Sequence, residues 1–524
     1  MNSLQSLISL VQHTVPTLGR RAFYGLLVVL LCAPVLDAFA QAAPAADGIV
    51  IQYKGQLRRT GEGQSLQLEP GHRQLIRPTG SVSAAGMQRQ LNTLRQDPNV
   101  EFAEPNYIGY FQDMRSNVDV GYFSANASLV AQQWWLQDIA GNTLRSIGFG
   151  NDVTVAVIDS GVDFSHPNLA PNLLANGYNF GDDNAFPIDL RGHGTAISGI
   201  IAATSNSSSY GIDGLAPGVK ILPIKVNLRD ENVYNAFNIA RGIDHAIANK
   251  ANIINLSLGF AIPNLTVQTA IQRALDKGIV VVAAAGNDGG AVNFPGSMPG
   301  VIGVAATNQS RTLAIFSSRG PEVAIAAPGV DIFTTDLGGR FTARSGTSFS
   351  SPIVVAAIAD LMSVNRGLTP QGLLNQIRAT AGLIPGVSNY GLLNAGAAGE
   401  KLLPYLKPSS SRYNRSQSVE LQYEMPQTGG PVNVYVSAQT PAGSYTLLPN
   451  GTWQPVPASG SLPVAANYRS DAPVAGVLFG AKGLFASVPM AGLPIGSYKL
   501  SSALASAVTG KPVGITTEVA FTLE

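Results

Sequence analysis

The sequence contains a serine, Ser348, whose neighbours could make it a nucleophile. A serine hydroxyl is a weak nucleophile unless a nearby base takes its proton. In the stretch SGTSFSSPIVV (345–355), Ser348 follows a Gly-Thr pair and precedes an apolar stretch that predicts a helix from about residue 350. A hydroxyl at a helix N-terminus gains from the positive end of the helix dipole and from backbone N–H groups. We therefore take Ser348 as the candidate nucleophile, and we expect packing or N-capping roles for Ser345, Ser350 and Ser351.

The candidate base for this serine is His193, one of five histidines in the chain. It stands between two glycines and opens a predicted apolar helix, where its ring would be exposed above a tight backbone. His245 falls inside a predicted helix and His166 precedes a proline in a loop, so both are expected to be structural. His13 and His72 lie in segments expected to be removed. A Ser–His–Asp system needs only one histidine, whereas so few histidines and a single cysteine argue against a zinc cluster.

Two further polar residues come directly after predicted buried strands. The strand VTVAVI (153–158) leads into Asp159, and GIVVVAAAGN (278–287) ends at Asn287. A carboxylate there could orient the histidine, although an aspartate in a turn is the commoner reason for such a pattern. An asparagine amide in this place could donate to a developing oxyanion. The order Asp, His, Asn, Ser is a more specific signal than any one of the four residues.

The segments that must position these side chains lie between residues 131 and 403. Short apolar runs there alternate with helical segments, which predicts parallel strands buried on both faces and joined by crossover helices. Sites in open α/β sheets lie beyond the carboxyl ends of the strands. We therefore expect an α/β domain with a mostly parallel, doubly wound sheet. The predicted strands are 153–158, 221–226, 252–257, 278–285 and 323–327, and the predicted helices are 192–203, 233–249, 265–277 and 351–364.

Two smaller regions flank this domain. Residues 45–112 predict an α+β unit with a strand at IVIQYK (49–54), a helix over 84–97 and an alternating stretch in DPNVEFAEPNY (97–107), followed by a polar linker. Residues 412–524 show apolar–polar alternation separated by turn-rich segments, which predicts a β-sandwich.

The first 40 residues have the pattern of a secretory signal peptide. Arg20 and Arg21 precede an apolar run over 23–36 that ends in Ala38-Phe39-Ala40, and this run is too short for a membrane anchor. The twin-arginine pattern is incomplete, and Leu31 before Cys32 argues against a lipoprotein. We expect a secreted protein, extracellular or periplasmic, with no membrane association after cleavage and no disulfide, because Cys32 is the only cysteine.

The composition narrows the classes of partner. Charged residues make up 12% of the 524 residues, and the net charge is +1. Because the chain lacks the basic excess typical of nucleic-acid-binding proteins, we expect no nucleic-acid partner.

Seven motifs together resemble those of subtilisin-like serine peptidases, the subtilases. The resemblance covers residues 134–403 densely and implies a serine endopeptidase that acts on protein or peptide substrates through an acyl-enzyme intermediate. It implies that Asp159 orients the base, that His193 is general base and then acid, and that Ser348 is the nucleophile. Asn287 and the backbone N–H of Ser348 would stabilise the oxyanion. The motifs are VAVIDSGVD (155–163), RGHGTAISGIIAA (191–203), INLSLG (254–259), VVAAAGN (281–287), FSSRG (316–320), AAPG (326–329) and SGTSFSSP (345–352).

The same resemblance implies a substrate cleft. Ser257, Leu258 and Gly259 would pair with an extended substrate by strand addition and form one wall of the pocket for the residue before the scissile bond. Ala285 and Gly286 would form the opposite wall, and such small uncharged walls mildly favour an apolar residue.

Three positions depart from the family pattern. Ala196 stands where many relatives carry a second histidine, and we expect this to tune activity rather than abolish it. Phe260 replaces a glycine and is expected to narrow the cleft. Asn168 replaces an aspartate that ligates calcium in many relatives, although the loop 204–210 could supply carbonyl ligands. The resemblance implies that the chemistry requires no cofactor. Whether the protein binds a structural calcium ion is left open, and no metal ligands are assigned.

The region 45–112 resembles the inhibitory pro-segment of such peptidases, which implies an intramolecular inhibitor and self-cleavage between about Tyr107 and Ala131. Two alternatives compete with this interpretation. One is a catalytically degenerate scaffold whose C-terminal β domain serves binding or adhesion, although all four catalytic candidates are present. The other is a carboxyl-type serine peptidase with Glu in place of His, against which RGHGT (191–195) argues.

Overall fold

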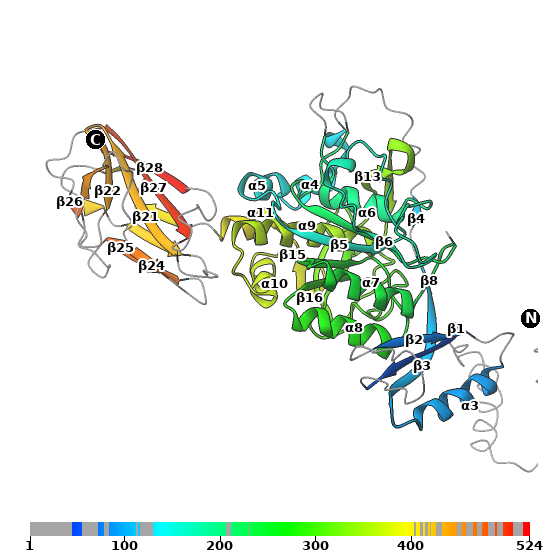
Figure 1. The fold of residues 1–524 in the computed structure, drawn as a ribbon. Coiled ribbons are helices and arrows are strands. Elements are labelled where there is room, and N and C mark those ends of the chain that lie inside the picture. Colours follow the sequence, from blue (N-terminus) through cyan, green and yellow to red (C-terminus); the bar gives the residue numbers. More distant parts are fainter. Residues whose placement is uncertain are drawn as a thin grey trace, which may run out of the picture. The chain divides into compact units, whose positions relative to one another are not determined.

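The computed structural model of the chain describes residues 45–54, 72–77, 83–111, 114–115, 129–205, 211–229 and 231–402, together with strand segments between residues 405 and 523 (Figure 1). The predicted signal peptide (1–40), most of the predicted linker after residue 112 and most of the loop 204–210 lie outside the described residues.

A mostly parallel sheet forms the centre of the region 131–402, which confirms the predicted α/β fold. Among the described residues it has nine strands in the order β15-β16-β12-β11-β10-β9-β5-β7-β6, and only the β15–β16 pair is antiparallel. The alanine- and glycine-containing strand β11 was not predicted. The strands are β5 (Thr154–Asp159), β6 (Tyr178–Asn179), β7 (Lys220–Lys225), β9 (Ile253–Leu256), β10 (Val280–Ala284), β11 (Ile302–Thr307), β12 (Val323–Pro328), β15 (Gly382–Ile384) and β16 (Val387–Leu392).

The central strands are buried on both faces, as their continuous apolar sequence predicts. In β5, Val155 and Val157 belong to one core cluster, while Ala156 and Ile158 belong to another. The first cluster includes residues of α6 (His193–Ala202) and α9 (Thr347–Val364), and the second includes residues of α7 (Ala236–Ala248) and α8 (Leu265–Asp276). Figure 1 shows these two pairs of helices on opposite sides of the sheet. Helix α9 is long and apolar enough to cross a membrane, but 94% of it is buried, as expected of a core helix.

Two predicted helices begin at other residues in the structure. The helix predicted over 233–249 starts only at Ala236, because Val233–Asn235 form the short strand β8 and the Asn235 side chain caps α7 by accepting from the N–H of Asn238. Helix α9 begins at Thr347 instead of residue 350 or 351, so Ser348 lies inside its first turn. The sequence pattern did not predict α4 (Trp134–Asp138), α5 (Gly141–Ile147), α10 (Pro370–Ala379), α11 (Ala395–Glu400) or the hairpin of β13 (Ile332–Asp336) and β14 (Arg340–Ser345).

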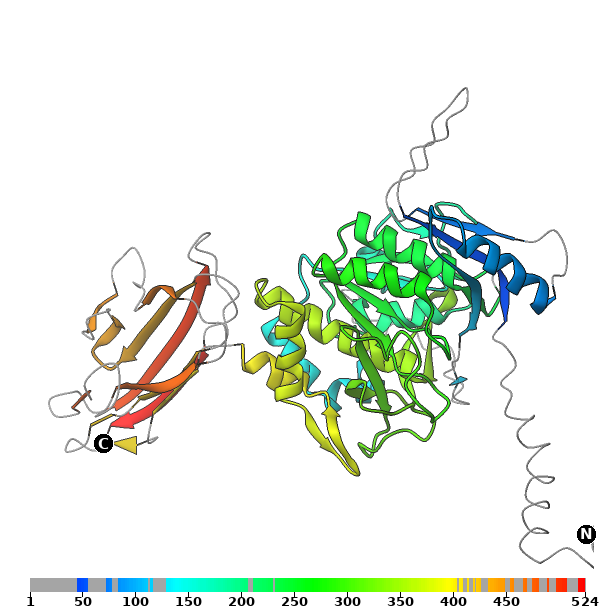
Figure 2. The same cartoon turned by 90° about the horizontal axis from the view of Figure 1, so that it is seen from below.

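The N-terminal region forms the predicted α+β arrangement. Strands β1 (Ala46–Tyr53), β2 (Arg73–Ile76) and β3 (Val100–Tyr110) share one sheet with β8, in the order β2-β1-β3-β8. Helix α3 (Ala84–Arg95) lies against this sheet (Figure 2). Its Leu91 belongs to a small core with residues of β1 and β3.

The described residues beyond 404 are all in strands or the turns between them, which agrees with the predicted β region. The longest strand, β27 (Gly496–Ser506), lies between β21 (Val432–Thr440) and β28 (Thr517–Leu523) in an antiparallel arrangement. The other strands are β17 (Tyr405–Pro408), β18 (Arg412–Tyr413), β19 (Ser418–Val419), β20 (Leu421–Met425), β22 (Gly443–Leu447), β23 (Trp453–Pro455), β24 (Ala465–Tyr468), β25 (Val474–Phe479) and β26 (Val488–Pro489).

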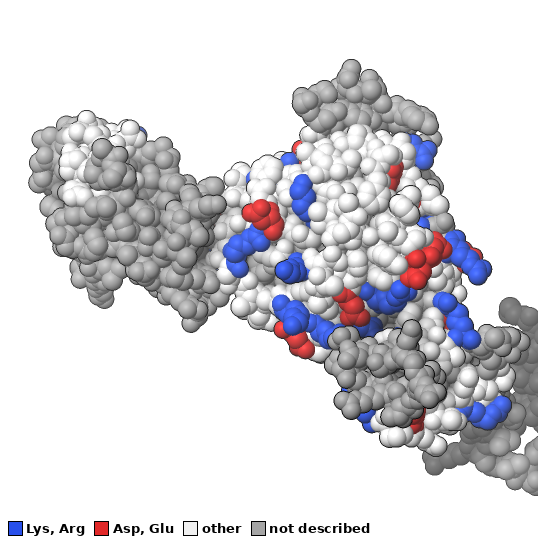
Figure 3. All heavy atoms as spheres, viewed as in Figure 1, with Lys and Arg blue, Asp and Glu red and all other residues white. Residues whose placement is uncertain are grey.

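On the face drawn in Figure 3, the described Lys and Arg side chains are interspersed with Asp and Glu between wide uncharged areas, in keeping with the near-neutral composition.

Candidate active site

Asp159 and His193 form a buried pair at the carboxyl end of the sheet. Strand β5 ends at Asp159 and helix α6 begins at His193. The Asp159 Oδ1 atom lies 2.7 Å from His193 Nδ1, and the two residues are 0% and 1% exposed, so the prediction of an exposed histidine ring is wrong. Because a carboxylate can only accept, Nδ1 carries the proton, and Nε2 is the nitrogen that remains for base chemistry.

A residue that sequence reasoning missed, Asp189, holds the turn that leads into α6. Its carboxylate accepts from the backbone N–H groups of Arg191, Gly192 and Thr195 and from the hydroxyls of Thr195 and Ser160, at 2.7 to 2.9 Å. A carboxylate at a helix N-terminus is favourable for the helix dipole and satisfies N–H groups that have no partner inside the helix. Asp189 therefore fixes the backbone on which His193 stands. Its position shortly before a predicted helix was the available signal.

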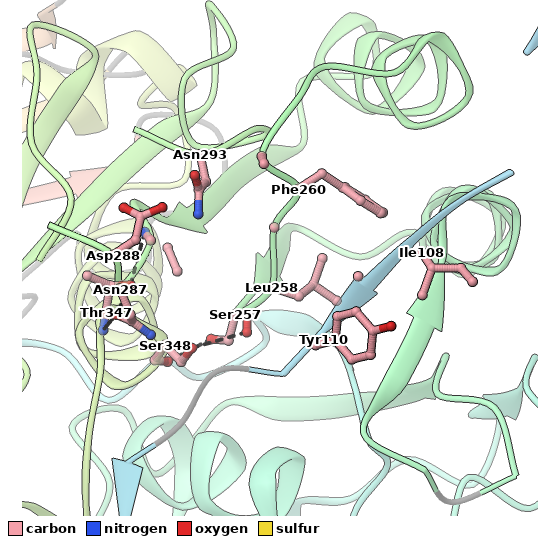
Figure 4. A pocket seen from close by; sticks show the side chains of 15 residues that line it. Ile108, Tyr110, Ser257, Leu258, Phe260, Asn287, Asp288, Asn293, Thr347 and Ser348 are labelled. Carbon is pink, nitrogen blue, oxygen red and sulfur yellow. Dashed lines mark hydrogen bonds between the residues drawn. The ribbon is translucent and has the colours of Figure 1, made fainter. Parts of the chain in front are cut away.

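Ser348 is held in the first turn of α9 by the end of β9. The Ser348 hydroxyl donates to the carbonyl of Ser257 at 3.3 Å, and the Ser257 hydroxyl donates to the carbonyl of Ser348 at 2.7 Å (Figure 4). Asn255 donates to the Ser257 hydroxyl, and the Ser351 hydroxyl donates to Asn255. The first turn of α9 also lies beside the base, because the Phe349 ring is 5.5 Å from the His193 ring.

The other serines of the stretch have packing roles. Ser345 accepts from the N–H of Asp331, and Ser350 donates to the carbonyl of Pro328. None of them caps α9, whose N-cap is Gly346 without a side-chain bond. The predicted packing is therefore correct and the predicted capping is wrong.

The amide of Asn287 has a fixed orientation. Its Oδ1 atom accepts from the backbone N–H and from the hydroxyl of Thr347, both at 2.8 Å, and the Thr347 hydroxyl accepts from the N–H of Gly286 at 3.1 Å. A backbone N–H can only donate, so the amide oxygen must face Thr347 and the amide nitrogen lies at the opposite end. This orientation leaves Nδ2 as the donor end, which is what an oxyanion site needs.

The pocket beside Ser348 has two walls. Ser257, Leu258, Gly259 and Phe260 line one wall, as predicted for the first three (Figure 4). The other wall contains Ala284, Gly286 and Asn287.

The prediction for Ala285 is wrong, because its side chain lies in a core cluster with Val292 and Ala305. Successive residues of an extended segment face opposite sides, so Ala284 and Gly286 face the pocket and Ala285 faces away from it. Asp288 and Asn293 also line the pocket and make it more polar than the predicted small walls.

The chain's own N-terminal region enters this pocket. Ile108, Gly109 and Tyr110 line it, and β3 pairs antiparallel with β8 through Ile108↔Asn235, Gly109↔Tyr234 and Tyr110↔Val233. The N–H of the next residue, Phe111, donates to the carbonyl of Asn232 at 3.3 Å. The Phe111 ring is 3% exposed and lies 5.1 Å from the His193 ring.

This segment does not pair with residues 257–259, which are expected to pair with a substrate. Among the described residues, the β3 ladder runs along β8 and not along 257–259. Gly259 instead donates its N–H to the Tyr234 hydroxyl at 2.9 Å and accepts from the same hydroxyl at 2.6 Å. The tyrosine thus engages both backbone groups that an added strand would use.

The same region caps two helices of the α/β region, α7 and α8. The Glu104 carboxylate accepts from the N–H groups of Leu265 and Thr266 at the start of α8, at 3.0 and 2.6 Å. The Asn106 side chain accepts from the N–H of Phe237 at the start of α7, at 2.9 Å. Each contact satisfies a helix-terminal donor.

The remaining candidates have structural partners. His166 Nε2 contacts the carbonyl of Arg340, and His245 Nε2 contacts that of Asn176, which agrees with the structural roles predicted for both histidines. Asn168 donates to the carbonyl of Thr204 and accepts from the N–H of Ile212. No group of three metal-ligating side chains occurs within the part of the chain that the structure describes.

Comparisons with known proteins agree with this geometry. The model of the subtilase family matches residues 150–414. A thermophilic serine proteinase of Bacillus sp. (strain AK1) is 34% identical over 349 residues, which cover 65% of this chain and 84% of that protein. Subtilisin E of Bacillus subtilis (strain 168) is 34% identical over 323 residues, 60% of this chain and 79% of that protein. The minor extracellular protease Epr of the same organism is 32% identical over 333 residues, 63% of this chain and 50% of that protein.

Proposed function

Since this chain belongs to the subtilase family and is a serine endopeptidase, we propose that it is an exported enzyme, made as a self-processing zymogen, that cleaves peptide bonds through an acyl-enzyme intermediate. The observation that supports this most strongly is the buried 2.7 Å contact of Asp159 with His193 beside the first turn of α9. A degenerate scaffold is not favoured, because the residues that such a scaffold would have lost, Asp159, His193, Asn287 and Ser348, are all present.

The proposed reaction begins when His193 Nε2 takes the proton of the Ser348 hydroxyl. The Ser348 Oγ atom then attacks the carbonyl carbon of the scissile bond, while Asp159 stabilises the imidazolium. The oxyanion accepts from Asn287 Nδ2 and from the backbone N–H of Ser348 at the start of α9. His193 then gives its proton to the leaving amine, the acyl-enzyme forms, and a water molecule activated by His193 hydrolyses it.

The proposed substrate is an extended polypeptide segment bound antiparallel to β8. The segment 107–111 supports this, because it already adds to that strand and places Phe111 on His193. Main-chain pairing of this kind provides affinity that depends little on side chains.

We further propose that residues 45–112 are the inhibitory pro-segment and that the chain cuts itself between Phe111 and Met114. The described residues reach the site along β8 as far as Phe111. They continue beyond it at β4 (Met114–Arg115), which pairs antiparallel with Arg344 and Ser345 of β14 just before Ser348. This narrows the range of 107–131 that the sequence predicts.

The export proposal rests on the signal-like residues 1–40 and on the similarity to a relative that is named as extracellular. The proposed peptidase domain is 131–403, and 412–524 is proposed as a separate β domain. The chemistry needs no cofactor. We propose no calcium ligand at Asn168, because its amide engages the carbonyl of Thr204 and the N–H of Ile212.

The test of this function is covalent labelling with a fluorophosphonate, which reacts with an activated serine. Peptide mapping of the labelled protein should place the label on Ser348, and His193→Ala should abolish labelling. A label on another serine, or undiminished labelling of His193→Ala, would refute the assignment.

A further inference from the structure

We propose that Lys225 is a positioning residue for His193 and acts through the loop over residues 187–192. The inference rests on the proposed function, because it concerns the histidine that would serve as the base. Lys225 stands at the carboxyl end of β7, where it is the register partner of Asp159 at the end of β5. The lysine is therefore one strand away from the carboxylate that contacts the histidine.

The Lys225 side chain lies on the same face of the sheet as Asp159. The preceding residues, Ile224 and Ile158, both belong to the core cluster that contains residues of α7 and α8. Because successive side chains of a strand point to opposite faces, Lys225 and Asp159 both point away from that cluster, on strands about 4.8 Å apart. Lys225 is only 2% exposed, and a lysine is rarely buried unless its charged group has a defined partner.

The ammonium group of Lys225 is bonded to the loop that leads into α6. Its Nζ atom donates to the carbonyl of Ile188 at 2.8 Å. Ile188 directly precedes Asp189, whose carboxylate accepts from three backbone N–H groups of the turn under His193. A hydrogen bond from a charged donor is stronger than one between neutral groups. Lys225 therefore fixes the backbone from which Asp189 supports the histidine.

The same loop is packed tightly against the chain that follows β5. A Cβ atom on Gly161 would lie 2.5 Å from the carbonyl oxygen of Pro187 and 3.0 Å from the nitrogen of Asp189. The N–H of Val162 donates to the carbonyl of Pro187 at 3.0 Å. The loop is thus bonded to the chain after β5 and, through Lys225, to β7. Loss of the lysine removes one of these two supports, so we expect the turn under the histidine to shift.

The charge of Lys225 has a second consequence, which a neutral support would lack. A nearby cation disfavours the protonated form of a histidine, so removing this cation should make His193 easier to protonate. Tyr234, whose ring packs against Phe111, adds no charge of its own, because burial raises its pKa. The charged groups that the structure describes on the elements around the histidine are Asp159, Asp189 and Arg191, and the ion pair of Asp336 with Arg344, which lies against Gly192.

The experiment compares three variants of the processed enzyme. Lys225→Met keeps the length of the side chain and removes its charge and its donor, whereas Lys225→Arg keeps the charge. Lys220→Met is the matched control, because Lys220 begins the same strand and donates to the carbonyl of Pro171 at 2.9 Å. The measurements are kcat/KM as a function of pH, on an internally quenched peptide with the sequence of residues 105–116, and the rate of labelling by a fluorophosphonate.

Lys225→Met should lower kcat/KM and the labelling rate at least about tenfold, the scale of a misplaced catalytic group. The midpoint of the acid limb of kcat/KM should also rise by at least about 0.3 pH unit, because the histidine loses a neighbouring cation. Lys225→Arg should keep the wild-type midpoint. Lys220→Met should keep both the wild-type midpoint and the wild-type rate.

A wild-type rate or a wild-type midpoint in Lys225→Met would overturn the inference, and so would an equal shift of the midpoint in Lys225→Arg or Lys220→Met. If Lys225→Met fails to fold, as judged by its melting temperature in the Ser348→Ala background, Lys225→Gln is measured in its place with the same expected results. A wild-type enzyme that the fluorophosphonate does not label contradicts the proposed function instead, so the two failures can be told apart.

Discussion

The ring of Phe111 lies 5.1 Å from the ring of His193, so the chain covers its own proposed base with an aromatic side chain from its N-terminal region. The residue before Phe111 lines the pocket beside Ser348, and β3 runs along β8 like a bound substrate. This arrangement connects the proposed catalytic mechanism to the proposed self-cleavage.

Asn287→Ala should lower kcat about 10²- to 10³-fold and leave KM nearly unchanged, because the amide would act on the oxyanion and not on the bound substrate. Steady-state kinetics on an internally quenched peptide measure kcat and KM separately. Asn389→Ala, which changes an exposed asparagine on β16, is the matched control and should have no effect on kcat. A rise in KM alone would contradict the role in the transition state.

Glu104→Ala should weaken the attachment of the N-terminal region to α8. The variant leaves the N–H groups of Leu265 and Thr266 without their carboxylate, at a cost of about 1 to 2 kcal/mol. In a Ser348→Ala background, the melting temperature of the precursor should fall. Glu101→Ala changes an exposed glutamate of the same strand and should have a smaller effect. Equal melting temperatures for the two variants would count against the capping contact.

Asp189→Ala should destabilise the fold by at least about 2 kcal/mol, because three backbone N–H groups lose a buried acceptor. Urea unfolding in the Ser348→Ala background measures this without self-digestion. Fluorophosphonate labelling should also be lost when Asp189→Ala is made in the chain with Ser348 intact, since the turn under His193 loses its support. Unchanged stability would mean that Asp189 does not hold this turn.

Asp360 makes stability depend on pH. It lies in α9, and neither carboxyl oxygen has a hydrogen-bond partner among the described residues. Burial raises the pKa of this carboxyl well above its ordinary value, so the folded chain keeps the proton to higher pH than the unfolded chain does. The stabilising proton is fully present below the unfolded pKa of about 4, and stability falls as pH rises from there toward the folded pKa.

Asp360→Asn should therefore gain stability relative to the parent as pH rises above about 4. Melting temperatures across this range, in the Ser348→Ala background, measure the difference. Asp152→Asn changes a side chain that is 96% exposed and should give a curve parallel to that of the parent. A parallel curve for Asp360→Asn as well would show that the carboxyl is ionised in the fold.

The sequence predicted the elements whose pattern is local. Strands such as β5 and β10 are continuous apolar runs, and the polar residues that follow them, Asp159 and Asn287, stand at the carboxyl edge of the sheet as expected. The placement of Ala285 was wrong by one residue, because a run of three alanines does not reveal which of them faces the pocket.

The remaining features depend on residues far apart in the chain. Strand β8 has only three residues and forms by pairing with β3. Because the residues after it have a helical pattern, the sequence predicted a helix in its place. The position of Asp189 shortly before a predicted helix was a sequence signal, but the backbone N–H groups that it bonds under His193 follow only from the turn before α6.

The most direct test of self-cleavage by Ser348 is the N-terminal sequence of the purified protein, compared with that of Ser348→Ala made in a peptidase-free host. We predict a wild-type protein that begins at residue 112, 113 or 114, and a Ser348→Ala protein that retains the segment before it. A wild-type N-terminus elsewhere would contradict the placement of the segment across the site. Normal processing of Ser348→Ala would contradict self-cleavage by Ser348.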